Sequence, residues 1–128
     1  MFTLGQIREI HDRLGKAETL AQYLQALKAI GVETCDSFVT DGHSEYVGKH
    51  DQKVISPPAH ETLTVVHTSN REQLLELLVL LTQQQTSYLE MSKALAESGV
   101  EKWTFDTNHM TITYYDKAGQ EMYAEAIQ

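Results

Sequence analysis

The segment 40–46 contains the densest group of side chains that could carry chemistry. Asp41, His43, Glu45 and Tyr46 lie there around a single glycine. An imidazole next to two carboxylates could perform acid–base work or bind a polar ligand, because its charge changes near neutral pH. These four residues are therefore the candidate ligand-binding site, and the sequence assigns no catalytic residue.

A structural interpretation of this segment stays open beside the functional one. Asp41-Gly42 is a strong signal for a tight hairpin turn, which needs a positive φ angle. On this interpretation Asp41, His43 and Glu45 are more than half exposed, and His43→Ala barely changes stability. The corresponding turn of the second half, residues 108–110, reads Asn-His-Met and lacks the acidic residues. This difference favours a function for the first turn, but only slightly.

Other catalytic or metal-binding motifs are absent from the sequence. It contains no G-x-S-x-G, P-loop, Rossmann glycine, H-E-x-x-H or C-x-x-C pattern. None of the six histidines is spaced three or four residues from another on an expected helix, so we assign no metal or other cofactor. Cys35 is the sole cysteine, which excludes an internal disulfide, and we expect it in the core rather than as a nucleophile.

Length and charge limit the classes of partner. With 128 residues, 41% of them hydrophobic, the chain is expected to form one domain over residues 1–128. The formal net charge of −8 argues against nucleic acid or an anionic membrane as a partner, because both need clustered Lys and Arg. The first residues carry neither the basic stretch nor the apolar run of a signal peptide, so we expect a cytoplasmic protein.

The expected elements form the same series twice: two helices, a Gly-Val pair and three short strands. At an offset of 68 residues, segments 26–55 and 94–123 share eight identical positions. The expected fold is therefore α+β, with two pseudo-repeated units, about 1–60 and 69–128, that pack helices against antiparallel β-meanders. A coincidental match is the alternative, because Gly-Val after a helix is common.

Apolar periodicity and turn residues place the individual elements. Gly31 and Gly99 are expected to end helices with a positive φ angle. Alternation places Trp103, Phe105 and Tyr114 in the core, with Met110 and Ile112 on the face of Tyr114, and Tyr115 and Tyr123 on the opposite face. The expected helices cover residues 3–14, 18–30, 70–84 and 87–98; the expected strands cover 32–39, 43–48, 53–55, 100–106, 110–114 and 122–126, and 62–67 is extended.

The helix expected over 70–84 is unusually apolar, since seven of the eight residues 74–81 are aliphatic. Its main stripe consists of Leu74, Leu77, Leu78 and Leu81. Val79 and Leu80 lie far to either side of that stripe, and a core on one side of a helix cannot easily use both. Either the helix is enclosed by its own domain, or one flank meets another chain. We expect the second arrangement, a homodimer or larger even assembly.

Several short segments, spread over essentially the whole chain, carry a resemblance to a known family. They are Gly31-Val32-Glu33, Phe38-Val39 with Asp41-Gly42-His43 and Tyr46, Thr86-x-Tyr88-Leu89, Gly99-Val100-Glu101-Lys102-Trp103, and Tyr114-Tyr115-Asp116-Lys117-Ala118-Gly119. In these residues the chain resembles DUF1398, a bacterial family whose function is not assigned. The resemblance implies a small cytoplasmic α+β protein and transfers no catalytic residue. Family members are often labelled phage envelope proteins.

Two functions are compatible with these observations. The first is a non-enzymatic binding or interaction module, whose small-molecule ligand the sequence does not identify. The second is a small enzyme or metal-dependent protein that uses Asp41, His43 and Glu45.

Overall fold

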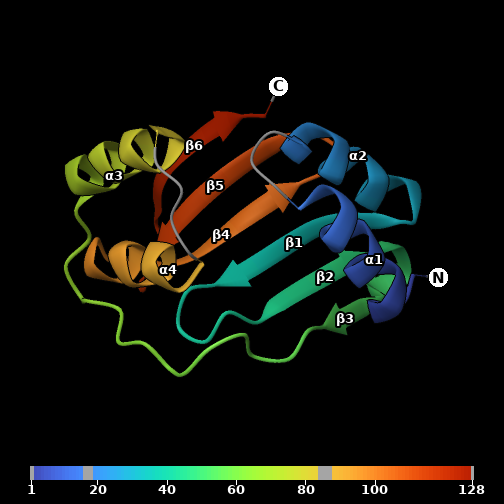
Figure 1. Cartoon of the computed structure of the whole chain (residues 1–128), viewed down its shortest axis with the longest axis horizontal. Coiled ribbons are helices and arrows are strands. Elements are labelled where there is room, and N and C mark those ends of the chain that lie inside the picture. Colours follow the sequence, from blue (N-terminus) through green and yellow to red (C-terminus); the bar gives the residue numbers. More distant parts are fainter. Residues whose placement is uncertain (1, 16–18, 84–87, 128) are drawn as a thin grey trace.

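The computed structural model describes residues 2–15, 19–83 and 88–127, with the backbone alone at 81–83 and 88. Four helices and six strands follow one another in the expected order (Figure 1). The predicted helix ends at 84 and 87 lie outside the described residues. The elements are α1 (Leu4–Leu14), α2 (Leu20–Ala29), β1 (Val32–Phe38), β2 (Ser44–Gly48), the 3-10 turn η2 (Lys49–Asp51), β3 (Lys53–Ile55), α3 (Arg71–Gln83), α4 (Tyr88–Glu97), β4 (Val100–Asp106), β5 (Thr111–Asp116) and β6 (Glu121–Ala126).

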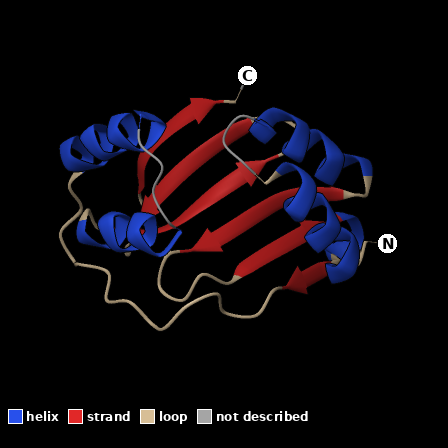
Figure 2. Ribbon diagram, viewed as in Figure 1, coloured by secondary structure: helices blue, strands red, loops and turns tan. Residues whose placement is uncertain are grey.

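The strands form one antiparallel sheet in the order β3-β2-β1-β4-β5-β6, and the helices cover one of its faces (Figure 2). All four helices contribute to the same hydrophobic core. The predicted α+β single-domain fold is confirmed. Alternate strand residues point into this core, and the predicted core residues Cys35, Trp103, Phe105 and Tyr114 are all buried. The residues between them lie on the other face, which none of the described helices covers and which we call the helix-free face (Figure 2).

Local signals mark where the helices begin and end, and the two helix-ending glycines have the predicted positive φ angles. Thr3 caps α1, and its hydroxyl accepts the Gln6 N–H at 3.2 Å in a capping box. Asn70 caps α3 in the same way and accepts the Gln73 N–H at 2.9 Å. Gly31 and Gly99 follow α2 and α4 with φ angles of 105° and 87°.

The two halves of the sheet meet at β1 and β4 in a symmetrical register. Asp36 pairs with Thr104, 68 residues later, and the other pairs are arranged evenly around them. The β1–β2 and β4–β5 pairs also share one register at this offset, including a bulge after Val32 and after Val100. A bulge between Tyr114 and Tyr115 breaks the correspondence at β6. A duplication of one ancestral unit stays a prediction.

Three predictions for single segments were wrong. The first hairpin has no two-residue turn, because β1 ends at Phe38 and the loop runs through His43. Met110 lies outside β5 and has a φ angle of 54°, as a turn residue does. Tyr123 shares the helix-covered face with Tyr114, against which its ring stacks at 6.3 Å.

The segment 62–67, which was predicted as extended, is a loop and adds no strand to the sheet.

The leucine-rich helix α3 is only partly enclosed by its own domain. Leu74 is fully buried, and Leu77 and Leu78 pack against the core. Val79 and Leu80 are 56% and 51% exposed. The side chain of Leu81, the fourth predicted member of the stripe, lies outside the described residues.

We predict unequal effects for alanine at the two helix-ending glycines. Both substitutions strain a positive φ angle and should lower the free energy of unfolding by about 1 kcal/mol. At Gly99 the added Cβ would also lie 2.7 Å from the carbonyl oxygen of Thr68, whereas at Gly31 its nearest neighbour is 3.7 Å away. Chemical denaturation should therefore show a larger loss for Gly99→Ala. Gly5→Ala is the control, because its Cβ would meet one atom at 3.9 Å. Equal stability of Gly99→Ala and Gly5→Ala would contradict this account.

Candidate functional site

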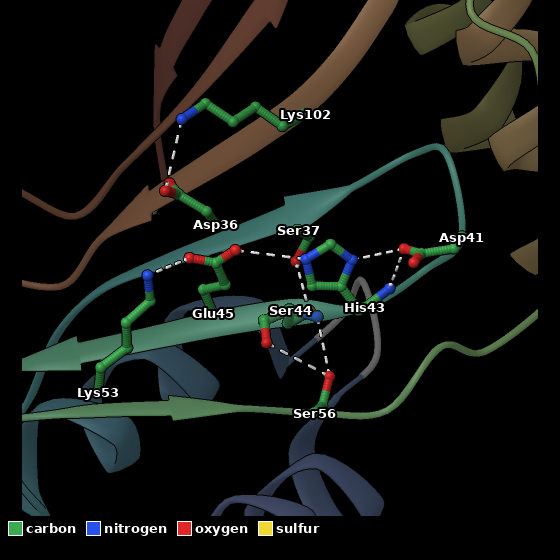
Figure 3. Close-up of polar contacts among 9 residues, drawn as sticks. All are labelled: Asp36, Ser37, Asp41, His43, Ser44, Glu45, Lys53, Ser56 and Lys102. Carbon is green, nitrogen blue, oxygen red and sulfur yellow. Dashed lines mark hydrogen bonds and ion pairs between the residues drawn. The ribbon is translucent and has the colours of Figure 1, made fainter. Parts of the chain in front are cut away.

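The first hairpin brings together most of the predicted site in a chain of polar contacts (Figure 3). His43 Nδ1 lies 2.5 Å from a carboxylate oxygen of Asp41, and His43 Nε2 lies 3.3 Å from one of Glu45. Glu45 extends the chain to the Lys53 ammonium, 2.6 Å away on β3. The same carboxylate oxygen of Asp41 also accepts a 3.0 Å hydrogen bond from the His43 backbone N–H, and this bond positions Asp41 within the loop.

Tyr46, the fourth predicted site residue, lies on the other face of the sheet. It follows Glu45 in β2, so its side chain points into the core, where it is 6% exposed. Burial raises the pKa of its phenol to about 12. Cys35 pairs with it across the strands and is also buried, which raises the pKa of the thiol to about 12. Neither side chain can reach a ligand at the hairpin tip.

The prediction that Asp41, His43 and Glu45 are more than half exposed was wrong. Their side chains are 28%, 22% and 22% exposed. Phe38 covers one side of His43, with the two rings stacked at 4.4 Å and 4°. This ring comes from the preceding strand, so local turn chemistry could not indicate the burial.

A distant segment covers the hairpin tip from another side. The N–H groups of Ala59 and His60 donate to the Asp41 carbonyl at 2.8 and 3.1 Å. A Cβ at Gly42 would lie 2.8 Å from the Ala59 side chain, so this close approach needs glycine. Segment 59–60 therefore fixes the loop that carries Asp41 and His43.

The hydrogen-bond geometry assigns a charge to His43. Ionised carboxylates only accept hydrogen bonds, so an imidazole held between two of them needs a proton on both nitrogens. Although burial lowers the pKa of His43, the bonds to Asp41 and Glu45 outweigh it and raise that pKa above its ordinary value. Lys53 is the main cause that lowers the pKa of Glu45. Burial opposes ionisation of Asp41, but hydrogen bonds from His43 lower its pKa.

This arrangement is poorly suited to proton transfer. A general base needs a nitrogen lone pair directed at its substrate. Both nitrogens of His43 already face protein carboxylates. The nearby hydroxyls of Ser37 and Ser44 contact each other at 3.0 Å, and Ser37 is buried on the helix-covered face. The site is therefore a balanced charge network rather than an assembled nucleophile and base.

A row of four side chains crosses the helix-free face beside this network. We call His43, Phe38, Lys102 and Tyr115 the aromatic–cation row. Phe38 pairs with Lys102, and Lys102 pairs with Tyr115, on neighbouring strands. The Lys102 ammonium lies 5.8 Å from the centre of the Phe38 ring and 5.3 Å from that of Tyr115. Both distances fit cation–π contacts.

Asp36 connects the row to the centre of the sheet. Its carboxylate accepts the Thr104 hydroxyl at 2.6 Å and lies 3.4 Å from the Lys102 ammonium. Sequence reasoning missed Lys102 and Phe38 as site residues, although both lie in segments that it singled out. The usable signal was strand alternation, which places Phe38 and Glu45 on one face.

The second hairpin has its own carboxylate–imidazole pair, but an exposed one. Asp106 and His109 Nδ1 lie 2.9 Å apart, and the His109 side chain is 78% exposed. Burial opposes ionisation of Asp106, while hydrogen bonds from His109 lower its pKa. His109 therefore provides a natural comparison for His43.

A match to a family model confirms the resemblance seen in the sequence. The model described as "Protein of unknown function (DUF1398)" matches residues 8–126. The chain belongs to the DUF1398 family. No curated protein matches its sequence.

Two further properties of this DUF1398 protein concern its described residues. Within them, no three His, Cys, Asp or Glu side chains are grouped so that they could hold a metal ion. No described helix has the length and apolar character that crossing a bilayer requires.

We predict a pH-dependent loss of stability for His43→Ala in this DUF1398 protein. A hydrogen bond to a charged group contributes about 1.5–3 kcal/mol, so the variant should unfold more easily than the parent. The raised pKa of His43 contributes stability that is fully present below the ordinary value of 6.5. This contribution is lost as pH rises through the pKa that His43 has in the folded protein. The lowered pKa of Glu45 contributes above 4.5 and is lost as pH falls.

Denaturation of parent and variant from pH 4 to 9 checks this prediction. The difference in stability should be largest between the ordinary pKa values of 4.5 for Glu45 and 6.5 for His43. The stacking of His43 on Phe38 adds a contribution to the stability difference that does not depend on pH. His109→Ala, at the exposed pair, should change stability little. A pH-independent difference, or an equal loss for both variants, would show that the network does not stabilise the fold.

Proposed function

We propose that this DUF1398 protein is a non-enzymatic binding module that holds a small anionic ligand with a flat ring. The ligand lies on the helix-free face of the sheet, against the aromatic–cation row. The observation that carries the proposal is an asymmetry between two rows of side chains on that face.

The two rows occupy equivalent places in the two halves of the sheet. At the offset of 68, the equivalents of His43, Phe38, Lys102 and Tyr115 are Thr111, Asp106, Thr34 and Val47, which form the opposite row. The strand registers pair Thr111 with Asp106, Asp106 with Thr34, and Thr34 with Val47. The opposite row therefore has the same backbone position but no ring and no cation. Pairing of the strands does not require the rings, which supports a role in binding.

The chemistry of the row defines the class of ligand. Phe38 and Tyr115 are half-buried, and aromatic rings favour a flat, unsaturated partner. An ammonium group has three N–H donors. Among the described residues, Asp36 is the one carboxylate within salt-bridge distance of Lys102, at 3.4 Å. Lys102 can therefore donate to a carboxylate or phosphate group of a ligand whose ring lies on Phe38 or Tyr115.

A small enzyme or metal-dependent protein using Asp41, His43 and Glu45 is the alternative. It has weaker support, because His43 is bound through both nitrogens and the Cys35 thiol is buried. A cytoplasmic location and an association with prophages also stay proposals. They rest on the sequence and on the family resemblance, and mass spectrometry of induced phage particles would test the second.

We predict that anionic ring compounds raise the melting temperature of the protein, since a ligand that binds only the folded state stabilises it by mass action. A thermal-shift screen against a metabolite panel identifies the compound, and NMR shifts map its position. The perturbed amides should cluster at Phe38, Lys102 and Tyr115. Phe38→Leu and Lys102→Met should each weaken binding on the order of tenfold or more.

Thr111→Ala in the opposite row is the matched control and should keep the affinity. Equal affinity of Phe38→Leu, Lys102→Met and the parent would place the ligand elsewhere and reject the proposal. Conversion of the bound compound into a product, lost in His43→Ala, would establish the enzyme alternative.

A further inference from the structure

Helix α3 and strand β6 together expose an apolar surface at one end of the molecule. Val79 is 56% exposed on the flank of α3 that faces β6. A groove of about 260 Å³ runs between the two elements. It is lined by Leu75, Leu78, Val79, Tyr123 and Glu125. An exposed aliphatic side chain beside an open groove with apolar walls is typical of a surface that another chain covers.

Comparison with α1 shows that the fold itself does not require this apolar surface. The two helices align at their caps, because Thr3 and Asn70 both accept the N–H three residues later. In this alignment the fully buried Leu74 matches the buried Ile7. On the flank that faces β6, Leu75 and Val79 match the exposed residues Arg8 and Asp12. The same positions are therefore charged on one helix and aliphatic on the other.

Strand β6 is an open edge of the sheet next to this surface. The Ile127 N–H donates to the Met110 carbonyl at 2.8 Å. Because hydrogen-bonded pairs alternate along an antiparallel ladder, the backbone groups of Ala124 and Ala126 point away from β5. The other edge, β3, has three residues and is followed after Ser56 by two prolines, which discourage pairing. Of the two edges, β6 is thus the one suited to a further strand.

We propose that a second copy of this chain covers the surface, with β6 pairing antiparallel to β6 of the other copy and α3 packing against its counterpart. A two-fold axis through Ala124 makes the edge complementary to itself, since each Ala124 meets the other. The β1–β4 junction already joins two three-stranded units in this way, with helices on the same face. The dimer repeats that arrangement at the open edge.

Charge complementarity supports this partner and register. Arg71 on α3 donates from Nε to the Met122 carbonyl at 2.9 Å, so its guanidinium lies at the β6 edge. With the axis through Ala124, residue 123 of one copy lies opposite residue 125 of the other. Arg71, which lies 5.8 Å over the Tyr123 ring, therefore faces Glu125 of the second copy. Two such pairs form in each dimer.

Light scattering and sedimentation test the proposal on the full chain. The parent should have twice the chain mass of 14.5 kDa. Val79→Glu should halve the mass, whereas Asp12→Glu should not, although it puts the same side chain at the equivalent place on α1. Ala124→Pro should also give a folded monomer, because it removes an N–H that does not bond within the chain's own sheet. Circular dichroism checks that each variant is folded.

A charge exchange tests the register. Arg71→Glu and Glu125→Arg should each weaken the dimer, and the two together should restore it. If Val79→Glu does not fold, Ala124→Pro and the exchange decide the question. A monomeric parent overturns the proposal. So does a dimer that persists in both Ala124→Pro and a folded Val79→Glu, since another surface then holds it.

Discussion

The register of β1 against β4 is the constraint on which the rest of the molecule depends. This pair joins the two halves into one sheet, and it is centred on Asp36 and Thr104. A slip of one residue would turn every side chain of a strand to the other face. Asp36 and Phe38 would then enter the core, and Cys35 would leave it. The 2.6 Å hydrogen bond from Thr104 to Asp36 helps to specify the register from the solvent side.

The same register creates both the core and the helix-free surface. Cys35 and Trp103 face the helices because Asp36 and Lys102 face away from them. The aromatic–cation row is therefore a consequence of pairing between distant strands. Phe38 and Lys102 are 64 residues apart in the sequence, yet they are direct partners across β1 and β4.

Much of the fold was predictable because its signals are local. Helix caps and helix-ending glycines act within four or five residues, so Thr3, Gly31 and Gly99 could be placed from the sequence. Strand alternation identified the core position of Trp103 for the same reason. The side of Tyr123 was not predictable, because the bulge in the β5–β6 pair shifts the register by one residue. Nothing in the alternating pattern of β6 marks that bulge.

The candidate site was predictable in type but not in extent. Asp41, His43 and Glu45 are neighbours in the sequence, and their chemistry identifies them. Their partial burial depends on Phe38 and on segment 59–60, which reach the loop through the tertiary structure. The sequence did contain one further signal, the comparison of the two halves at the offset of 68. It would have shown that ring and cation positions on one row are polar or aliphatic on the other.

The charge network and the neighbouring Asp36–Lys102 pair together explain how an acidic protein keeps three carboxylates at one place. Asp36, Asp41 and Glu45 lie on or beside the helix-free face, and each has a cation within 3.4 Å. When His43 is protonated, at mildly acidic pH, three cations balance the three carboxylates. Once His43 loses its proton, the group carries an excess negative charge. Lys102 has the loosest of these contacts, at 3.4 Å, and it lies between two rings. Of the three cations, the Lys102 ammonium makes the longest contact with a carboxylate of the protein, and it is therefore the one best placed to bind an anion.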